Sequence, residues 1–222
     1  MARISRNVPF EEWVRYNFDH AVTDPAWYWD VDADSVELDS SPHIFYTTQL
    51  FSGSTETLSP FTDAQVNQGL WLLIGESTSE LRVLRDETLP LADRICCVDS
   101  IFALFRDCFA RRCTSHLSYI DEPGAGALNL VCYMWWDIFP LIGHPEDALQ
   151  RQIDDACLDV MQKTLEIPSI ACQESALHGL GHWTLSYGDR CRKIIESFVQ
   201  NHPDLQPRLR DYAMSASRAE IL

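Results

Sequence analysis

The stretch Ala171–Trp183, with the sequence ACQESALHGLGHW, constrains the fold of this chain more than any other segment. An α-helix turns by about 100° per residue, so in a helix its small and polar residues fall on different sides. One side holds Cys172, Ala176, Gly179, Leu180 and Trp183, and the other holds Glu174, His178 and His182. Each glycine inside a helix costs about 1 kcal/mol relative to alanine. Because this cost is accepted mainly where a neighbour approaches closely, the stretch predicts a helix packed between other helices.

From residue 64 onward, apolar stripes at helical spacing alternate with short segments that contain proline or glycine. They predict helices over residues 64–74, 91–113, 128–139, 146–165, 190–201 and 209–218, in addition to the Ala171–Trp183 helix, which ends before Gly188. Thr62 and Asp63 can cap the first of them. Short connections favour antiparallel helix pairs, and units of about 40 residues are typical of HEAT and armadillo arrays. The sequence therefore predicts an all-α fold, with an irregular helical-repeat domain over residues 64–222.

Residues 1–63 differ from the rest of the chain. They include three Lys or Arg residues against eleven Asp or Glu residues, a formal charge of −8. Residues 10–20 can form a short amphipathic helix, and residues 44–51 have the pattern of a short strand or extended arm. The segment is predicted to be an acidic, aromatic and mostly non-helical extension that packs on the helical domain.

An aromatic run in this segment, Trp27–Trp29, leads directly into closely spaced acids. These acids are Asp30, Asp32, Asp34, Glu37 and Asp39. In an extended chain, successive side chains point to opposite faces. We therefore expect the two tryptophans to face the helices, while Asp30, Asp32 and Asp34 face solvent.

The charge balance limits the classes of partner. Asp and Glu outnumber Lys and Arg by 33 to 17, which gives a formal net charge of −16 at pH 7. Nucleic acids and anionic membrane surfaces are bound mainly through Lys and Arg, so the composition disfavours both. A basic protein is the partner that the charge favours, through electrostatic steering. The alternative is that the acids serve solubility alone.

Three features indicate a cytoplasmic protein. Residues 1–13 contain no apolar stretch of the kind found in secretory signals. The longest apolar segment, residues 125–142, is interrupted by Asn129, Asp137 and Pro140, so it predicts a buried helix rather than a membrane span. Most of the eight cysteines lie in apolar helical patterns, which is typical of reduced thiols in a core.

Glu174, His178 and His182 are the clearest candidates for chemistry. They follow one another at intervals of four residues, so they form one stripe along the predicted helix. Two histidines in this arrangement can hold a metal ion, with a carboxylate one turn away as a third ligand. One helix seldom completes a metal site, however, and no matching histidine pair occurs in the other predicted helices. We therefore interpret the stripe as the polar face of a packed helix, and we predict no metal, cofactor or catalytic residue.

The segment Cys172–His182 is similar to the second helix of a HEAT repeat, in which small residues permit a close helix contact. Together with Asp63–Trp71 and Cys132–Asp137, it resembles a group of uncharacterised bacterial HEAT-like proteins. This resemblance implies a HEAT-like fold and no particular activity. The HEAT-like enzyme deoxyhypusine hydroxylase binds two irons through repeated His-Glu pairs. Here the pair Gln173-Glu174 has glutamine in the histidine position, which disfavours a di-iron centre.

The sequence thus favours a non-catalytic, cytoplasmic module that binds a protein. In its most specific form, the hypothesis is an immunity-type inhibitor whose acidic surface blocks a basic toxin, such as a nuclease. Two alternatives stay open: a metal-dependent HEAT-like enzyme centred on Glu174, His178 and His182, and a scaffold subunit of a larger complex. The candidate binding residues are Asp30, Asp32, Asp34, Glu37, Asp39, Glu174, His178 and His182.

Overall fold

Helices make up most of the structure, a computed structural model that describes residues 4–75 and 80–221. The α-helices are α1 (Phe10–Phe18), α2 (Ser40–Ser52), α3 (Ser54–Thr57), α4 (Asp63–Ile74), α5 (Leu91–Leu104), α6 (Ala110–Arg112), α7 (Asn129–Met134), α8 (Gln150–Leu165), α9 (Ile170–Asn201) and α10 (Pro207–Ser217). Short 3-10 segments are η1 (Trp27–Trp29), η2 (Glu80–Arg85) and η4 (Ser118–Ile120), and η3 (Phe105–Phe109) is a π-helical turn. Within the described residues, two short strands, β1 (Ile4–Arg6) and β2 (Ser35–Glu37), pair in parallel. The prediction of a mainly α-helical protein is therefore confirmed.

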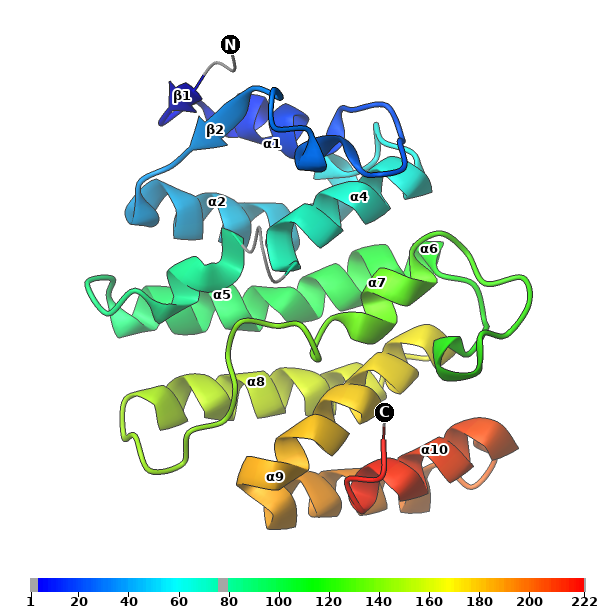
Figure 1. Cartoon of the computed structure of the whole chain (residues 1–222). Helices are drawn as coiled ribbons and strands as arrows, with labels where there is room; N and C mark the ends of the chain where they lie inside the picture. Colours follow the sequence, from blue (N-terminus) through cyan, green and yellow to red (C-terminus); the bar gives the residue numbers. More distant parts are fainter. Residues whose placement is uncertain (1–3, 76–79, 222) are drawn as a thin grey trace.

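The helices are stacked in successive layers (Figure 1). One row of packed helices runs from α2 through α5 and α8 to α9, and a second row runs from α1 through α4 and α7 to α9. At one end of the stack α10 packs on α9, and α1 lies with the two strands at the opposite end (Figure 1). None of the helices in the described parts of the chain has both the length and the hydrophobicity needed to cross a bilayer.

The acidic segment before residue 64 contributes to the same core as the later helices. Trp13 of α1 and Phe51 of α2 are almost completely buried, and both belong to one hydrophobic cluster with Phe105 and Trp135. The rings of Phe51 and Trp135 meet edge to face, with their centroids 5.7 Å apart. The segment is thus joined to the stack through its own helices, while the proposed domain boundary at residue 64 stays a prediction.

The strand or extended arm predicted over residues 44–51 is wrong, because these residues lie inside α2. The buried side chains of α2 belong to His43, Ile44, Thr47, Leu50 and Phe51, which is helical spacing. Two of these inward positions carry polar side chains, which weakens the apolar stripe in the sequence. The β-branched and aromatic residues between them favour a strand locally. Packing of α2 against α5 overrides that local preference.

Helix α4 begins where its capping residues predict. The hydroxyl oxygen of Thr62 accepts the backbone N–H of Gln65 at 3.3 Å, and the side-chain oxygen of Gln65 accepts the backbone N–H of Thr62 at 3.1 Å. This reciprocal arrangement is a capping box, which satisfies two N–H groups that the helix itself leaves unpaired.

The other predicted helices are present with shifted ends. Residues 91–112 are continuously helical through α5, η3 and α6, whereas α7 ends at Met134 and α8 begins only at Gln150. The late start of α8 has a local cause, because the carboxylate of Asp147 accepts the backbone N–H groups of Leu149 and Gln150 in a turn. Helix α10 begins at Pro207, where a proline without an N–H is well tolerated.

Helix α9 contains the small and polar stretch described above. It continues to Asn201 with a kink at Tyr187, whose backbone angles are φ −126° and ψ 39°, one residue before the break predicted at Gly188. A Cβ atom placed on Gly179 would lie only 2.5 Å from the Cβ of Trp136. The predicted close approach of a neighbour is confirmed, and that neighbour is the segment that follows α7.

Asp154 of α8 ties this kink to the loop before α8. Its side chain is completely buried, and its carboxylate accepts three hydrogen bonds. The donors are the backbone N–H of His144 at 2.7 Å, the side-chain amide of Gln150 at 2.8 Å and the hydroxyl of Tyr187 at 2.8 Å. A buried carboxylate is tolerated when its oxygens are paired in this way.

Candidate functional site

The segment that carries the candidate acids is folded into turns. Residues Trp27–Trp29 form η1, and the Asp30 carboxylate then accepts the backbone N–H of Asp32 at 2.9 Å. Such aspartate turns compete with extended backbone, and only Ser35–Glu37 in this region pairs as a strand. The predicted extended conformation is therefore wrong, and so is the inward position of Trp29, whereas the predicted exposure of Asp30, Asp32 and Asp34 is confirmed. Trp27 is half-buried, whereas Trp29 is 54% exposed.

All five candidate acids are exposed, but the structure divides them into two groups. Asp30 and Asp34 line a hollow, and Asp32 lies in the turn between them. Glu37 instead forms an ion pair with Arg6 at 3.1 Å, and Asp39 accepts a hydrogen bond from the side-chain amide of Asn7 at 2.8 Å. The latter two acids therefore hold the N-terminal strand segment.

The hollow beside Asp30 and Asp34, called the acidic hollow below, has a volume of 710 Å³. It is lined by Tyr16, His20, Thr23, Asp24, Pro25, Ala26, Trp27, Trp29, Asp30, Ala33 and Asp34, without any Lys or Arg. The Trp27 ring stacks on His20 with centroids 3.5 Å apart and meets Tyr16 edge to face at 5.3 Å. These two ring contacts hold the Trp27 side chain in place at the edge of the hollow. Aromatic faces beside carboxylates are suited to binding a cation.

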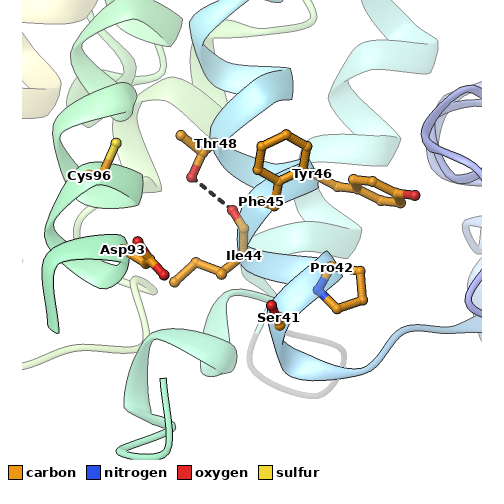
Figure 2. Close-up of a pocket in the computed structure, with 8 residues that line it drawn as sticks. All are labelled: Ser41, Pro42, Ile44, Phe45, Tyr46, Thr48, Asp93 and Cys96. Atoms are coloured by element: carbon orange, nitrogen blue, oxygen red, sulfur yellow. Dashed lines mark hydrogen bonds between the residues drawn. The ribbon is translucent and has the colours of Figure 1, made fainter. Parts of the chain in front are cut away.

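A second hollow, of 540 Å³, lies between α2 and α5 (Figure 2). The side chains that line it come mainly from α2, with Asp93 and Cys96 contributed by α5. The hydroxyl of Thr48 donates a hydrogen bond to the carbonyl oxygen of Ile44 in its own helix, at 2.7 Å. Of the lining residues, only Asp93 carries a charge. Apart from Asp93, Cys96 and Tyr46, the lining side chains cannot ionise, and the lining contains no histidine or lysine that could form a familiar catalytic pair with these three residues.

On α9, the structure separates Glu174 from the two histidines. Glu174 is completely buried, and its carboxylate accepts the backbone N–H groups of Ser118 at 2.9 Å and Tyr119 at 3.0 Å. Burial raises the pKa of Glu174 to about 7, although the two hydrogen bonds act in the opposite direction. The role of this carboxylate in the fold is to hold η4 against α9.

His178 is buried one turn further along α9 and is surrounded by tyrosines. Its Nδ1 lies 2.6 Å from the hydroxyl of Tyr212, which in turn lies 3.3 Å from the hydroxyl of Tyr133. The rings of Tyr133 and His178 are packed with centroids 4.2 Å apart. Burial lowers the pKa of His178 to about 3, so its ring is neutral at pH 7. A pocket of 280 Å³ lies beside Tyr133 and Tyr212.

His182 and Asp137 complete the cluster, which we call the His-Asp cluster. The Nε2 of His182 lies 3.3 Å from the Nε2 of His178 and 3.3 Å from an Oδ1 of Asp137. The side chains of His182 and Asp137 are each about one-third exposed. Sequence reasoning missed Asp137, because it follows a different helix and no spacing pattern links it to the histidines. The only sequence signal was a charged residue at the end of the apolar run Cys132–Trp136.

Comparisons of the chain with protein-family models, curated proteins and solved structures found no match. The resemblance to bacterial HEAT-like proteins therefore stays a prediction.

Proposed function

We propose that this protein is a non-catalytic binding module whose acidic hollow receives a basic side chain of a protein partner. The observation that carries the proposal is the lining of that hollow, where a fixed Trp27 and an exposed Trp29 stand beside Asp24, Asp30 and Asp34. A guanidinium or ammonium group over an aromatic face is stabilised by about 0.5–2 kcal/mol. Neighbouring carboxylates add charge-assisted hydrogen bonds, for which the planar guanidinium of arginine is the best donor.

The distribution of charge favours a basic partner over a free small cation. The formal net charge is −16, and half of it lies before residue 64, in the segment that forms the hollow. A charge of this size steers an oppositely charged protein toward the site and raises its association rate. The most specific form of the proposal is an immunity-type inhibitor that occupies the cationic surface of a basic toxin, such as a nuclease.

We also propose that the two rows of helices form an irregular HEAT-like array and that the protein acts in the cytoplasm. The ladder of contacts from α2 through α5 and α8 to α9 supports the first proposal, because each helix packs mainly on its neighbours. The second is supported by the cysteines, all of which lie in the described part of the chain and are free thiols.

The test begins with co-purification of the partner from the source organism and measurement of its association rate at several salt concentrations. Two variants remove the hollow's chemistry: Trp29→Ala, and Asp30→Asn combined with Asp34→Asn. We expect the charge variant to associate about 10-fold more slowly and to lose much of its salt dependence, because steering is electrostatic. We expect Trp29→Ala to act mainly on the dissociation rate.

A matched control removes two charges elsewhere in the same segment. Glu11 and Glu12 are exposed on α1 and do not line the hollow, so Glu11→Gln combined with Glu12→Gln has the same net charge as the double variant. Equal association rates for the two double variants would refute the hollow as the recognition site. A scaffold subunit would instead co-purify with several proteins and would inhibit none of them.

A further inference from the structure

The His-Asp cluster brings three potential metal ligands together from two parts of the chain. His178 and His182 lie one turn apart on α9, and Asp137 follows α7. One ligand atom from each of the three residues lies within 4.8 Å of the others. This convergence is independent of the acidic hollow and of the partner that we propose for it.

The two distances from His182 to the other residues of the cluster match those between the ligands of a tetrahedral metal ion. Zn²⁺ binds histidine nitrogen and carboxylate oxygen at about 2.0–2.2 Å, which places two ligand atoms of a tetrahedron about 3.3–3.6 Å apart. The Nε2 of His182 is 3.3 Å from the Nε2 of His178 and 3.3 Å from Oδ1 of Asp137. A charge-assisted hydrogen bond between a histidine and a carboxylate is shorter, about 2.7–2.9 Å. Both distances from His182 Nε2 therefore have the spacing of shared ligands rather than of a tight ion pair, and all three atoms lie within 4.8 Å of one another.

The surroundings of His178 orient its ring for such a role. Histidines that bind metals usually engage their other ring nitrogen in a hydrogen bond, which sets the tautomer and the direction of the ring. Here Nδ1 of His178 lies 2.6 Å from the hydroxyl oxygen of Tyr212. In the tautomer in which Nδ1–H donates to that oxygen, the Nε2 lone pair faces His182. The packing of Gly179 against Trp136 fixes α9 beside the residue that precedes Asp137.

We propose that Asp137, His178 and His182 form a mononuclear site for a divalent ion of the Zn²⁺ type. Two imidazoles and one carboxylate are a ligand set that suits Zn²⁺, and three protein ligands leave a fourth position for water. Because Asp137 and His182 are each about one-third exposed, the ion can enter from solvent. Asp137 replaces Glu174, the third ligand considered from sequence, whose carboxylate is held by η4.

The test uses the full chain, reduced and stripped of metals with a chelator. Titration with ZnCl₂ followed by calorimetry is expected to show one Zn²⁺ bound per chain. Titration with CoCl₂ is expected to give the visible absorption of tetrahedral Co²⁺ without the near-ultraviolet band of thiolate ligands. That band matters because the chain has eight cysteines that are alternative zinc ligands.

Variants then assign the site. His182→Ala and Asp137→Asn change side chains that are partly exposed, so the fold is expected to survive, which circular dichroism can verify. Each is expected to weaken Zn²⁺ binding by at least about 10-fold, and Tyr212→Phe, which removes the partner of His178 Nδ1, by about 10-fold. The matched control is His202→Ala, since His202 is also about one-third exposed and lies 3.7 Å from a carboxylate, that of Glu166.

Two results would overturn the proposal. The first is the absence of stoichiometric Zn²⁺ binding by the wild-type chain. The second is binding that persists unchanged in His182→Ala and Asp137→Asn, which would assign the metal to cysteines or other groups.

Discussion

Replacing Gly179 by alanine tests the close contact between α9 and Trp136. The added Cβ would lie 2.5 Å from Cβ and 2.7 Å from Cγ of Trp136, whereas carbon atoms in contact are about 3.5–4.0 Å apart. Trp136 has little freedom to withdraw. It is only 2% exposed, stacks on Phe105 with centroids 6.2 Å apart and contacts Phe139 at 5.2 Å. The overlap of about 1 Å must therefore be relieved by moving α9 or the segment after α7.

The expected change in the free energy of unfolding of Gly179→Ala combines two opposing contributions. Alanine is more favourable than glycine inside a helix by about 1 kcal/mol. Overpacking a filled core costs about 1–3 kcal/mol, and two rigid partners place Gly179→Ala at the upper end of that range. We expect a net loss of about 2 kcal/mol in the free energy of unfolding. For a chain of this length, each 1 kcal/mol changes Tm by about 2–4 °C, so Tm is expected to fall by roughly 4–8 °C.

Gly188→Ala is the matched control, because it makes the same change in the same helix. A Cβ at Gly188 would meet only Cγ2 of Thr184, at 3.9 Å, so this variant is expected to gain about 0.5–1 kcal/mol. Both variants can be compared by urea unfolding followed by circular dichroism, together with calorimetric Tm values. Equal stability of Gly179→Ala and Gly188→Ala would refute the close approach of α9 and Trp136.

Three further predictions concern buried and capping groups. Burial raises the pKa of Glu174 from an ordinary 4.5 to about 7, so the folded state binds this proton more tightly than the unfolded state does. The contribution of Glu174 to the free energy of unfolding therefore falls as pH rises from about 4.5 to 7. Glu174→Gln should reduce this pH dependence in urea unfolding, and an unchanged pH dependence would contradict the raised pKa. Asp154→Ala leaves three donors without their acceptor and should cost at least about 3 kcal/mol, whereas Asp189→Ala, at a side chain that is 93% exposed, should change stability by less than about 0.5 kcal/mol. Thr62→Ala should cost about 1 kcal/mol and speed amide exchange at Gln65, while Thr62→Ser should retain both; equal exchange in the two variants would argue against the capping box.

Helices could be predicted from the sequence where an apolar stripe at helical spacing begins or ends at a recognisable capping residue. The Thr62–Gln65 pair marks the start of α4, and the paired glycines Gly179 and Gly181 indicate a crowded helix before its neighbour is known. Prediction failed for α2, because polar residues occupy two of its inward positions. It also failed for the tryptophan-rich acidic segment, because aspartate turns there have no periodicity for a sequence pattern to detect.

The two candidate sites depended on information of different kinds. A concentration of acids and aromatic residues before residue 64 is visible in the sequence, but only the folded chain divides Asp30 and Asp34, which line the acidic hollow, from Glu37 and Asp39, which hold the strand segment. The four-residue spacing of the histidines on α9 is visible too. The sequence does not show which carboxylate joins these histidines. Glu174 is closer to them in the sequence, but the carboxylate that lies beside His182 in the structure is that of Asp137, while Glu174 binds the backbone of Ser118.

Residue types and their spacing were enough to predict that this protein is helical, that α9 is packed closely by a neighbour, and that the chain is strongly acidic. These properties depend on residue type and on spacing within one helix, where geometry is set by the backbone. Tertiary structure alone decided that Trp136 is that neighbour, that Tyr212 pairs with His178, and that Asp137 faces His182. Each of these contacts joins residues that are far apart in the sequence, and their relative placement depends on the packing of the whole stack rather than on any local pattern.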